Sequence, residues 1–184
     1  MVSTASKKLL KELPPEHHMK ANIVELLEKS HQAAALTGAA YLDHALQVLF
    51  LAAMRPLNSD QRARMFSGPN AILGTTSAKI YMAYAMRLIA EQTFRDLLLI
   101  NDIRNVFAHT LHDVTFETNE IALDCSKLQT FKAGLLTSIQ MTAKDRYILT
   151  VFSIYAGLRE NAERFISQGA ARERKEDGGE HPGS

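Results

Sequence analysis

The chain has 184 residues, of which 46% are hydrophobic and 22% are charged, and its formal net charge is +1. This composition is typical of one folded domain and excludes a disordered chain, because enough apolar residues are present to build a core. The near-zero charge makes direct DNA binding doubtful, since phosphate contacts supply most nonspecific affinity and require a basic surface.

The single cysteine and the short apolar runs predict a cytoplasmic protein. Cys125 is the only cysteine, so no intramolecular disulfide can form, which fits a reducing compartment. We interpret it as a small buried hydrophobe rather than a reactive thiol. The first residues contain no apolar run of signal-peptide length, and the longest apolar stretch, Ala45–Met54, is too short to span a bilayer. We therefore expect no membrane segment.

The proline positions favour an all-α fold. All five prolines lie outside the periodic segments, and a proline inside a helix would cost about 3 kcal/mol. We predict a single helical bundle of about six or seven helices over residues 15–169. A polar N-terminal arm is expected over residues 1–14 and a disordered C-terminal tail over residues 170–184, where no apolar anchor is present.

Three helices are expected in the first third of the chain. Residues 14–15 are both proline and suit the first turn of a helix. A long, alanine-rich helix is predicted over residues 30–54, where an Arg-Pro pair follows and ends it. Asn58 or Ser59 can then cap a short helix over residues 60–66.

The middle of the chain predicts two further helices. A loop punctuated by glycine and proline leads to a helix from residue 77 to about residue 90, capped by Thr75 or Thr76. This helix is apolar nearly all round, which predicts a place in the middle of the bundle. A tight turn near Glu91 then leads into a helix over residues 94–109.

The last third predicts a loop and two helices. Residues 110–123 have the character of a loop that can include a short hairpin. Asp124 is expected to cap a helix that runs to about residue 137. A long amphipathic helix is predicted over residues 143–168.

The helix over residues 94–109 carries polar groups that its apolar stripe does not require. Asn105 and His109 are four residues apart and share a face, and the long side chain of Arg104 can bend toward the same place. A guanidinium, a carboxamide and an imidazole can together hold or polarise a phosphate. The structural alternative is that His109 complements the helix dipole while Arg104 and Asn105 bind loop backbone.

A second group of charged residues surrounds Asp43, which lies in an otherwise apolar helix. Such a group is rarely buried without a partner, and Lys79 or Arg104 can supply one. An internal ion pair between two helices is the preferred interpretation, with catalysis as the alternative. Lys79, near a helix start, can instead bind an anion beside free backbone N–H groups. Asp96 and Asp102 lie close enough in sequence to orient Arg104.

Two other kinds of site have weaker support. His109, His112 and Asp113 lie within five residues, but no established metal-binding spacing accompanies them, so we predict no metal site. Residues 31–49 mimic a helix-turn-helix with Gly38 at the turn. The second half presents core residues instead of groups that read bases, and we reject the motif. No phosphate-loop or dinucleotide motif is present either, so no cofactor is predicted.

Several short motifs occur in order through residues 30–112. They are AAYLDHAL, Phe66-Ser67-Gly68, Leu73-Gly74, Ser77-Ala78-Lys79, Ala83-Tyr84, Leu88-Ile89, Asp96-Leu97 and IRNVFAH. In combination they resemble the mannitol operon repressor (MltR) family. The chain departs from the family pattern at Arg87, where a glycine is expected.

The resemblance implies an all-helical fold and a role in transcriptional regulation. Regulation would pass through a protein partner rather than through direct DNA reading, and a homodimer is compatible with it. The IRNVFAH segment is also similar to the Arg-x4-His motif of HEPN domains, many of which are metal-independent ribonucleases that work as dimers. Carried over, Arg104 would stabilise the phosphorane-like charge, His109 would act as acid or base toward the ribose 2′-hydroxyl, and Asn105 would position one of them.

Three functional hypotheses follow. The favoured one is a non-enzymatic regulator of the mannitol-repressor type. The second is a HEPN-like ribonuclease or toxin-type protein that acts on RNA through Arg104 and His109. The third is a small-anion sensor at Lys79 and Arg104.

Overall fold

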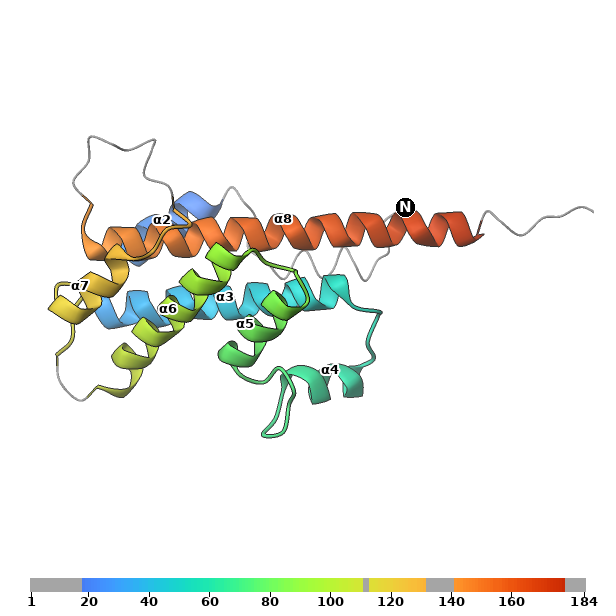
Figure 1. Ribbon diagram of the computed structural model, residues 1–184, viewed down its shortest axis with the longest axis horizontal. Coiled ribbons are helices and arrows are strands. Elements are labelled where there is room, and N and C mark those ends of the chain that lie inside the picture. Colours follow the sequence, from blue (N-terminus) through green and yellow to red (C-terminus); the bar gives the residue numbers. More distant parts are fainter. Residues whose placement is uncertain (1–17, 111–112, 132–140, 178–184) are drawn as a thin grey trace, which may run out of the picture.

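The computed structural model describes residues 18–110, 113–131 and 141–177, and these residues form seven α-helices and no strand (Figure 1). The helices are α2 (Met19–Glu28), α3 (His31–Ala53), α4 (Ser59–Phe66), α5 (Thr76–Ala85), α6 (Glu91–His109), α7 (Asn119–Ser126) and α8 (Ala143–Asp177). The prediction of an all-α bundle is confirmed. The expected arm over residues 1–14 lies outside the described residues, and α8 continues eight residues beyond the expected domain end at residue 169.

The two longest helices, α3 and α8, form the centre of the bundle and lie side by side (Figure 1). On one side α5 and α6 pack against α3 and against each other, while α2 and α7 pack against α8. The core is mostly apolar and is drawn from every helix described. One aromatic layer joins Phe107, Phe116 and Tyr147, with ring centroids 5.0–5.1 Å apart.

Gly38 allows α3 and α8 to approach closely. A Cβ atom at this position would lie 3.2 Å from Tyr147 Cε1 and 3.4 Å from Val151 Cγ2. The Tyr147 hydroxyl lies inside this contact and donates a hydrogen bond to the Ala35 carbonyl at 2.9 Å. Burial raises the pKa of Tyr147 well above its usual value, so the phenol stays neutral. Since α3 runs unbroken through Gly38, the rejection of a helix-turn-helix here is confirmed.

Helix starts follow the capping signals in the sequence. Ser30 accepts a hydrogen bond from a first-turn N–H of α3 at 3.3 Å, and Thr75 does the same for α5 at 3.1 Å. Asn58 and Gln61 form a reciprocal capping box at the start of α4, with distances of 2.9 and 3.0 Å. These side chains satisfy N–H groups that have no partner within the helix, so the starts of α3, α4 and α5 were predictable.

The end of α5 differs from the prediction, because the helix stops at Ala85 rather than near residue 90. Arg87 has φ +57°, in the left-handed region that favours glycine. The Leu88 N–H bonds to the Ala83 carbonyl and the Arg87 N–H to the Tyr84 carbonyl, both at 2.9 Å. This is a Schellman C-cap, whose left-handed position is most often glycine. It gives a physical reason for the glycine expected at residue 87, which lies in a turn and not on a helix face.

Two other predicted boundaries were wrong. The tight turn lies at residues 86–90, and Glu91 is the first residue of α6. α7 begins at Asn119, so Asp124 lies inside this helix and pairs with Lys127 at 2.7 Å instead of acting as a cap. Residues 113–118, where a hairpin was considered, contain no strand. The predicted helix from 124 to 137 was also wrong in its described part, because α7 ends at Ser126 and residues 127–131 are not helical, while residues 132–137 lie outside the described residues.

Cys125 on α7 is a structural thiol. It is completely buried, and burial raises its pKa to about 12. A thiol with so high a pKa is almost entirely protonated at neutral pH and is therefore a poor nucleophile. The interpretation of this cysteine as a small buried hydrophobe is confirmed.

α3 is long and apolar enough to cross a membrane by length and composition, although no such segment was predicted. Of its most apolar window, 56% is buried inside the protein, where α3 packs against α5, α6 and α8. A helix that is apolar on most sides and covered by neighbouring helices is typical of the centre of a soluble bundle. We therefore assign α3 as a core helix.

Candidate functional site

A polar cluster lies where α3, α5 and α6 meet. Asp43 of α3 receives a hydrogen bond on each carboxylate oxygen, from Thr76 Oγ1 at 2.8 Å and from Lys79 Nζ at 2.7 Å. Both donors belong to the first turns of α5, which Thr75 caps. The predicted internal ion pair between two helices is present, and the partner of Asp43 is Lys79 rather than Arg104.

The ion pair is asymmetric in its exposure. The Lys79 side chain is 4% exposed, whereas the Asp43 side chain is 32% exposed. A buried ammonium is costly unless a carboxylate compensates it, so the contact with Asp43 offsets the cost of burying Lys79. The pair therefore ties α5 to α3, and the open side of Asp43 faces a small pocket.

Arg104 lines this pocket from α6. The pocket has a volume of about 170 Å³, and its wall combines polar and apolar side chains: Leu36, Ala39, Ala40, Asp43, Thr76, Asn101 and Arg104. Arg104 Nη1 donates to Asn105 Oδ1 at 3.0 Å, and no ion pair of Arg104 occurs among the residues that the structure describes. Asn101 is buried and donates to Ser77 Oγ at 3.3 Å.

The predicted site residues are only partly brought together. Asp43, Lys79 and Arg104 belong to the cluster, and Asn105 contacts Arg104. His109 is exposed in the last turn of α6 and is not among the residues that line the pocket. The last turn is also the position at which an imidazolium would complement the helix dipole.

Asp96 was expected to orient Arg104, but it has another role. Its carboxylate accepts hydrogen bonds from Gln92 Nε2 at 2.9 Å and from the backbone N–H groups of Gln129 at 3.0 Å and Thr130 at 2.6 Å. Asp96 therefore anchors the segment after α7 to α6. Its main partners are backbone groups more than thirty residues away, which no side-chain pattern in the sequence could have indicated.

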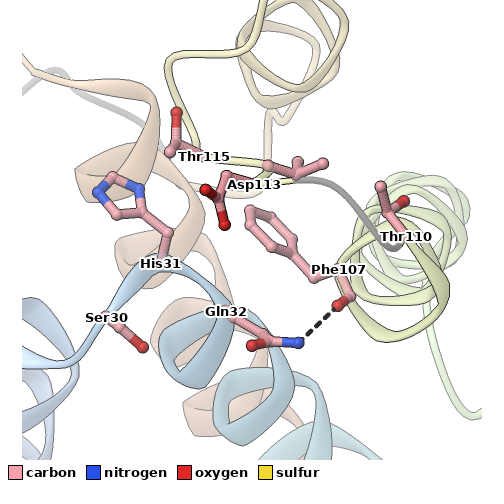
Figure 2. A pocket seen from close by; sticks show the side chains of 8 residues that line it. Ser30, His31, Gln32, Phe107, Thr110, Asp113 and Thr115 are labelled. Atoms are coloured by element: carbon pink, nitrogen blue, oxygen red, sulfur yellow. Dashed lines mark hydrogen bonds between the residues drawn. The ribbon is translucent and has the colours of Figure 1, made fainter.

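A larger hollow of about 570 Å³ lies between the start of α3 and the end of α6, and sequence reasoning missed it (Figure 2). Gln32 Nε2 closes one side by donating to the Phe107 carbonyl at 3.0 Å. His31 Nδ1 accepts from the Phe116 N–H at 3.1 Å, which fixes the ring at the rim. Asp113 also lines the hollow, but no group of three potential metal ligands occurs within the described residues, and His112 lies outside them.

An exposed aromatic patch covers the outer side of α5 and α6. We define it as Tyr81, Tyr84 and Phe94. Tyr81 is 57% exposed and Tyr84 is 40% exposed, and the Tyr84 ring stacks on Phe94 with centroids 4.3 Å apart. Tyr81 meets the same ring edge-on at 5.4 Å. The prediction that this apolar helix lies in the middle of the bundle was therefore wrong, because one side of α5 faces solvent.

Comparison with known proteins identifies a solved structure with a similar fold. No protein-family model and no curated protein matches the chain. The chain is similar to the X-ray structure of the MtlR–HPr complex from Escherichia coli, with a TM-score of 0.53 and 18% sequence identity. The match covers 89% of this chain and 99% of the other. At this identity the likeness shows the fold alone, so the protein has an MtlR-like helical fold.

Proposed function

We propose that the protein is a transcriptional regulator of the mannitol-repressor type, which acts through protein–protein contacts rather than by reading DNA. The observation that carries this proposal is the fold shared with MtlR over nearly the whole length of that chain. It agrees with the ordered motifs between residues 30 and 112 that resemble the family. Fold alone does not define function, so the proposal also needs a suitable surface.

The distribution of charge and the form of α3 support contact with a protein. The net charge is +1, which gives no basic excess for phosphate contacts. α3 is one continuous helix, and its residues Leu42 and Leu46 are buried in the core, so they are unable to enter a DNA groove. A cytoplasmic location follows from such a role and agrees with the buried, unpaired thiol of Cys125.

We propose an HPr-type protein as the partner and the aromatic patch as the surface that contacts it. MtlR was solved in complex with HPr, which makes HPr the first partner to test. Tyrosine and phenylalanine are enriched at protein interfaces, and contiguous exposed apolar patches often mark sites of protein–protein interaction. Because Phe94 already holds both tyrosine rings, little conformational entropy would be lost on binding.

Calorimetric titration of the purified chain with HPr tests the proposal. We expect a complex, and we expect Tyr81→Ser/Tyr84→Ser to weaken it at least about tenfold, since buried aromatic anchors carry much of the binding energy. Leu123→Ser is a matched control, because Leu123 is a similarly exposed apolar residue on α7. No binding of HPr, or equal loss in the control, would contradict the partner assignment. Tight, sequence-specific binding of duplex DNA by the chain alone would contradict the regulatory mode.

A second candidate function is a HEPN-like ribonuclease. The contact between Arg104 and Asn105 favours it, because the resemblance implies that Asn105 positions Arg104 or His109. Incubation with RNA in the presence of a chelator tests the activity. Cleavage that disappears in both Arg104→Ala and His109→Ala would support this function, whereas intact RNA, or cleavage unaffected by these changes, would exclude it.

A further inference from the structure

The pocket between α3, α5 and α6 contains one positive charge, that of Arg104, which no carboxylate among the described residues pairs with. Two cations, Lys79 and Arg104, face a single carboxylate, that of Asp43. Lys79 is buried and directly paired with Asp43, so it is not available to a ligand. Arg104 is half-buried, and its guanidinium donates one hydrogen bond to the neutral amide of Asn105.

The carboxylate in the pocket wall does not oppose an anion strongly. Both oxygens of Asp43 already accept hydrogen bonds, one from the Lys79 ammonium and one from the Thr76 hydroxyl. Its negative charge is therefore largely offset by Lys79 at 2.7 Å. Of the two charged residues that line the pocket, Asp43 is paired with Lys79, and Arg104 has no ion-pair partner among the described residues.

Other groups around the pocket favour the same sign of charge. Thr76 lies in the first turn of α5, at the positive end of that helix dipole. Asn101 donates one amide hydrogen to Ser77 and has a second one to offer. The volume of about 170 Å³ is smaller than the roughly 300–1,000 Å³ of pockets that enclose drug-sized ligands, and it suits one small anion.

We propose that this pocket binds a small oxyanion of the size and charge of phosphate, with Arg104 as its main ligand. Arginine suits this role because its planar donors match two oxygens of a phosphate at once. The sequence suggested Lys79 and Arg104 together as an anion site, whereas the structure assigns Lys79 to Asp43 and leaves Arg104 for the ligand. The site is independent of the proposed contact with HPr, because the aromatic patch lies on the outer side of α5 and α6.

Titration of the full chain with inorganic phosphate tests this proposal. Thermal unfolding is followed at constant ionic strength with sodium chloride as the reference, because phosphate also stabilises proteins nonspecifically. Calorimetry gives the dissociation constant. The unaltered protein is expected to bind phosphate, and Arg104→Gln is expected to weaken binding at least about tenfold.

Two further variants show whether any loss of phosphate binding is specific to the pocket. Arg95→Gln removes an exposed arginine of the same helix that already pairs with Glu91, and is expected to bind phosphate normally. Ala40→Leu fills the pocket from an exposed position of α3 without changing any charge, and is expected to abolish binding even if Arg104→Gln folds poorly. No response of the unaltered protein beyond chloride, or an equal response in Arg104→Gln or Ala40→Leu, would overturn the proposal.

Discussion

Similar side chains differ in burial and in hydrogen-bond partners between the α3–α8 pair and the α5–α6 pair. Between α3 and α8, Tyr147 is sealed in the core and its hydroxyl is bonded to backbone. On α5, Tyr81 and Tyr84 face solvent, and on α6 the charge of Arg104 lacks a counter-ion among the described residues. A structural group tends to have its partners within the protein, whereas an unsatisfied group remains available to something else. This contrast agrees with a stabilising role for the α3–α8 contact and with the recognition role that we propose for α5 and α6.

The largest expected effect comes from the ion pair that joins the two regions. Asp43→Ala leaves the Lys79 ammonium buried without a counter-charge, and should lower the free energy of unfolding by about 3–5 kcal/mol. Urea denaturation measures the loss. Asp43→Ala/Lys79→Met removes both charges and should recover most of it. If the double variant is as unstable as the single one, the pair does not act as described.

Substitution of Asp96 tests whether its contacts with the segment after α7 stabilise the fold. Asp96→Ala leaves the Gln129 and Thr130 N–H groups without their buried acceptor, and should cost about 3 kcal/mol in urea denaturation. Asp102→Ala, at an exposed position of the same helix, should change stability by less than about 0.5 kcal/mol. Similar losses in both variants would show that the anchor is not specific.

Tyrosine-to-phenylalanine changes compare the two regions directly. Tyr147→Phe deletes the hydrogen bond to the Ala35 carbonyl and should cost about 1 kcal/mol. Tyr84→Phe removes an exposed hydroxyl and should leave the free energy of unfolding unchanged within about 0.5 kcal/mol. Chemical denaturation of both variants measures the two changes in the free energy of unfolding. A larger loss of stability in Tyr84→Phe than in Tyr147→Phe would contradict this contrast.

The smallest effect is a gain at the turn between α5 and α6. Arg87→Gly relieves the left-handed backbone and should stabilise the protein by about 0.5–1 kcal/mol, because glycine adopts this conformation without steric cost. Arg95→Gly, inside α6, should instead lower stability by about 1 kcal/mol. Thermal unfolding distinguishes the expected gain in stability from the expected loss. Lower stability of Arg87→Gly would contradict the C-cap at the end of α5.

The sequence predicted features that depend on neighbouring residues and missed those that depend on distant backbone. Ser30, Asn58 and Thr75 cap their helices through side chains a few residues away, so their roles can be deduced locally. The end of α5 was misplaced because Arg87 occupies a position where glycine would have given the signal. The apolar surface of α5 predicted burial, but hydrophobicity alone does not indicate which side is covered by a neighbouring helix.

The candidate site was predicted in part for the same reason. A carboxylate within an apolar helix indicates a buried partner, which led to the pair of Asp43 and Lys79. The choice between Lys79 and Arg104 depends on how α5 and α6 cross α3, and this geometry has no local sequence signal. The hollow beside His31 also depends on tertiary packing, because it joins the start of α3 to the end of α6.

Amide chemical-shift mapping of the full chain titrated with HPr tests the central claim most directly, since it locates recognition on one of the two regions. We predict that the shifted amides cluster at Tyr81, Tyr84 and Phe94. Residues of the α3–α8 contact, such as Gly38 and Val151, should change little. Shifts confined to the α3–α8 region, or no shifts at saturating HPr, would contradict it.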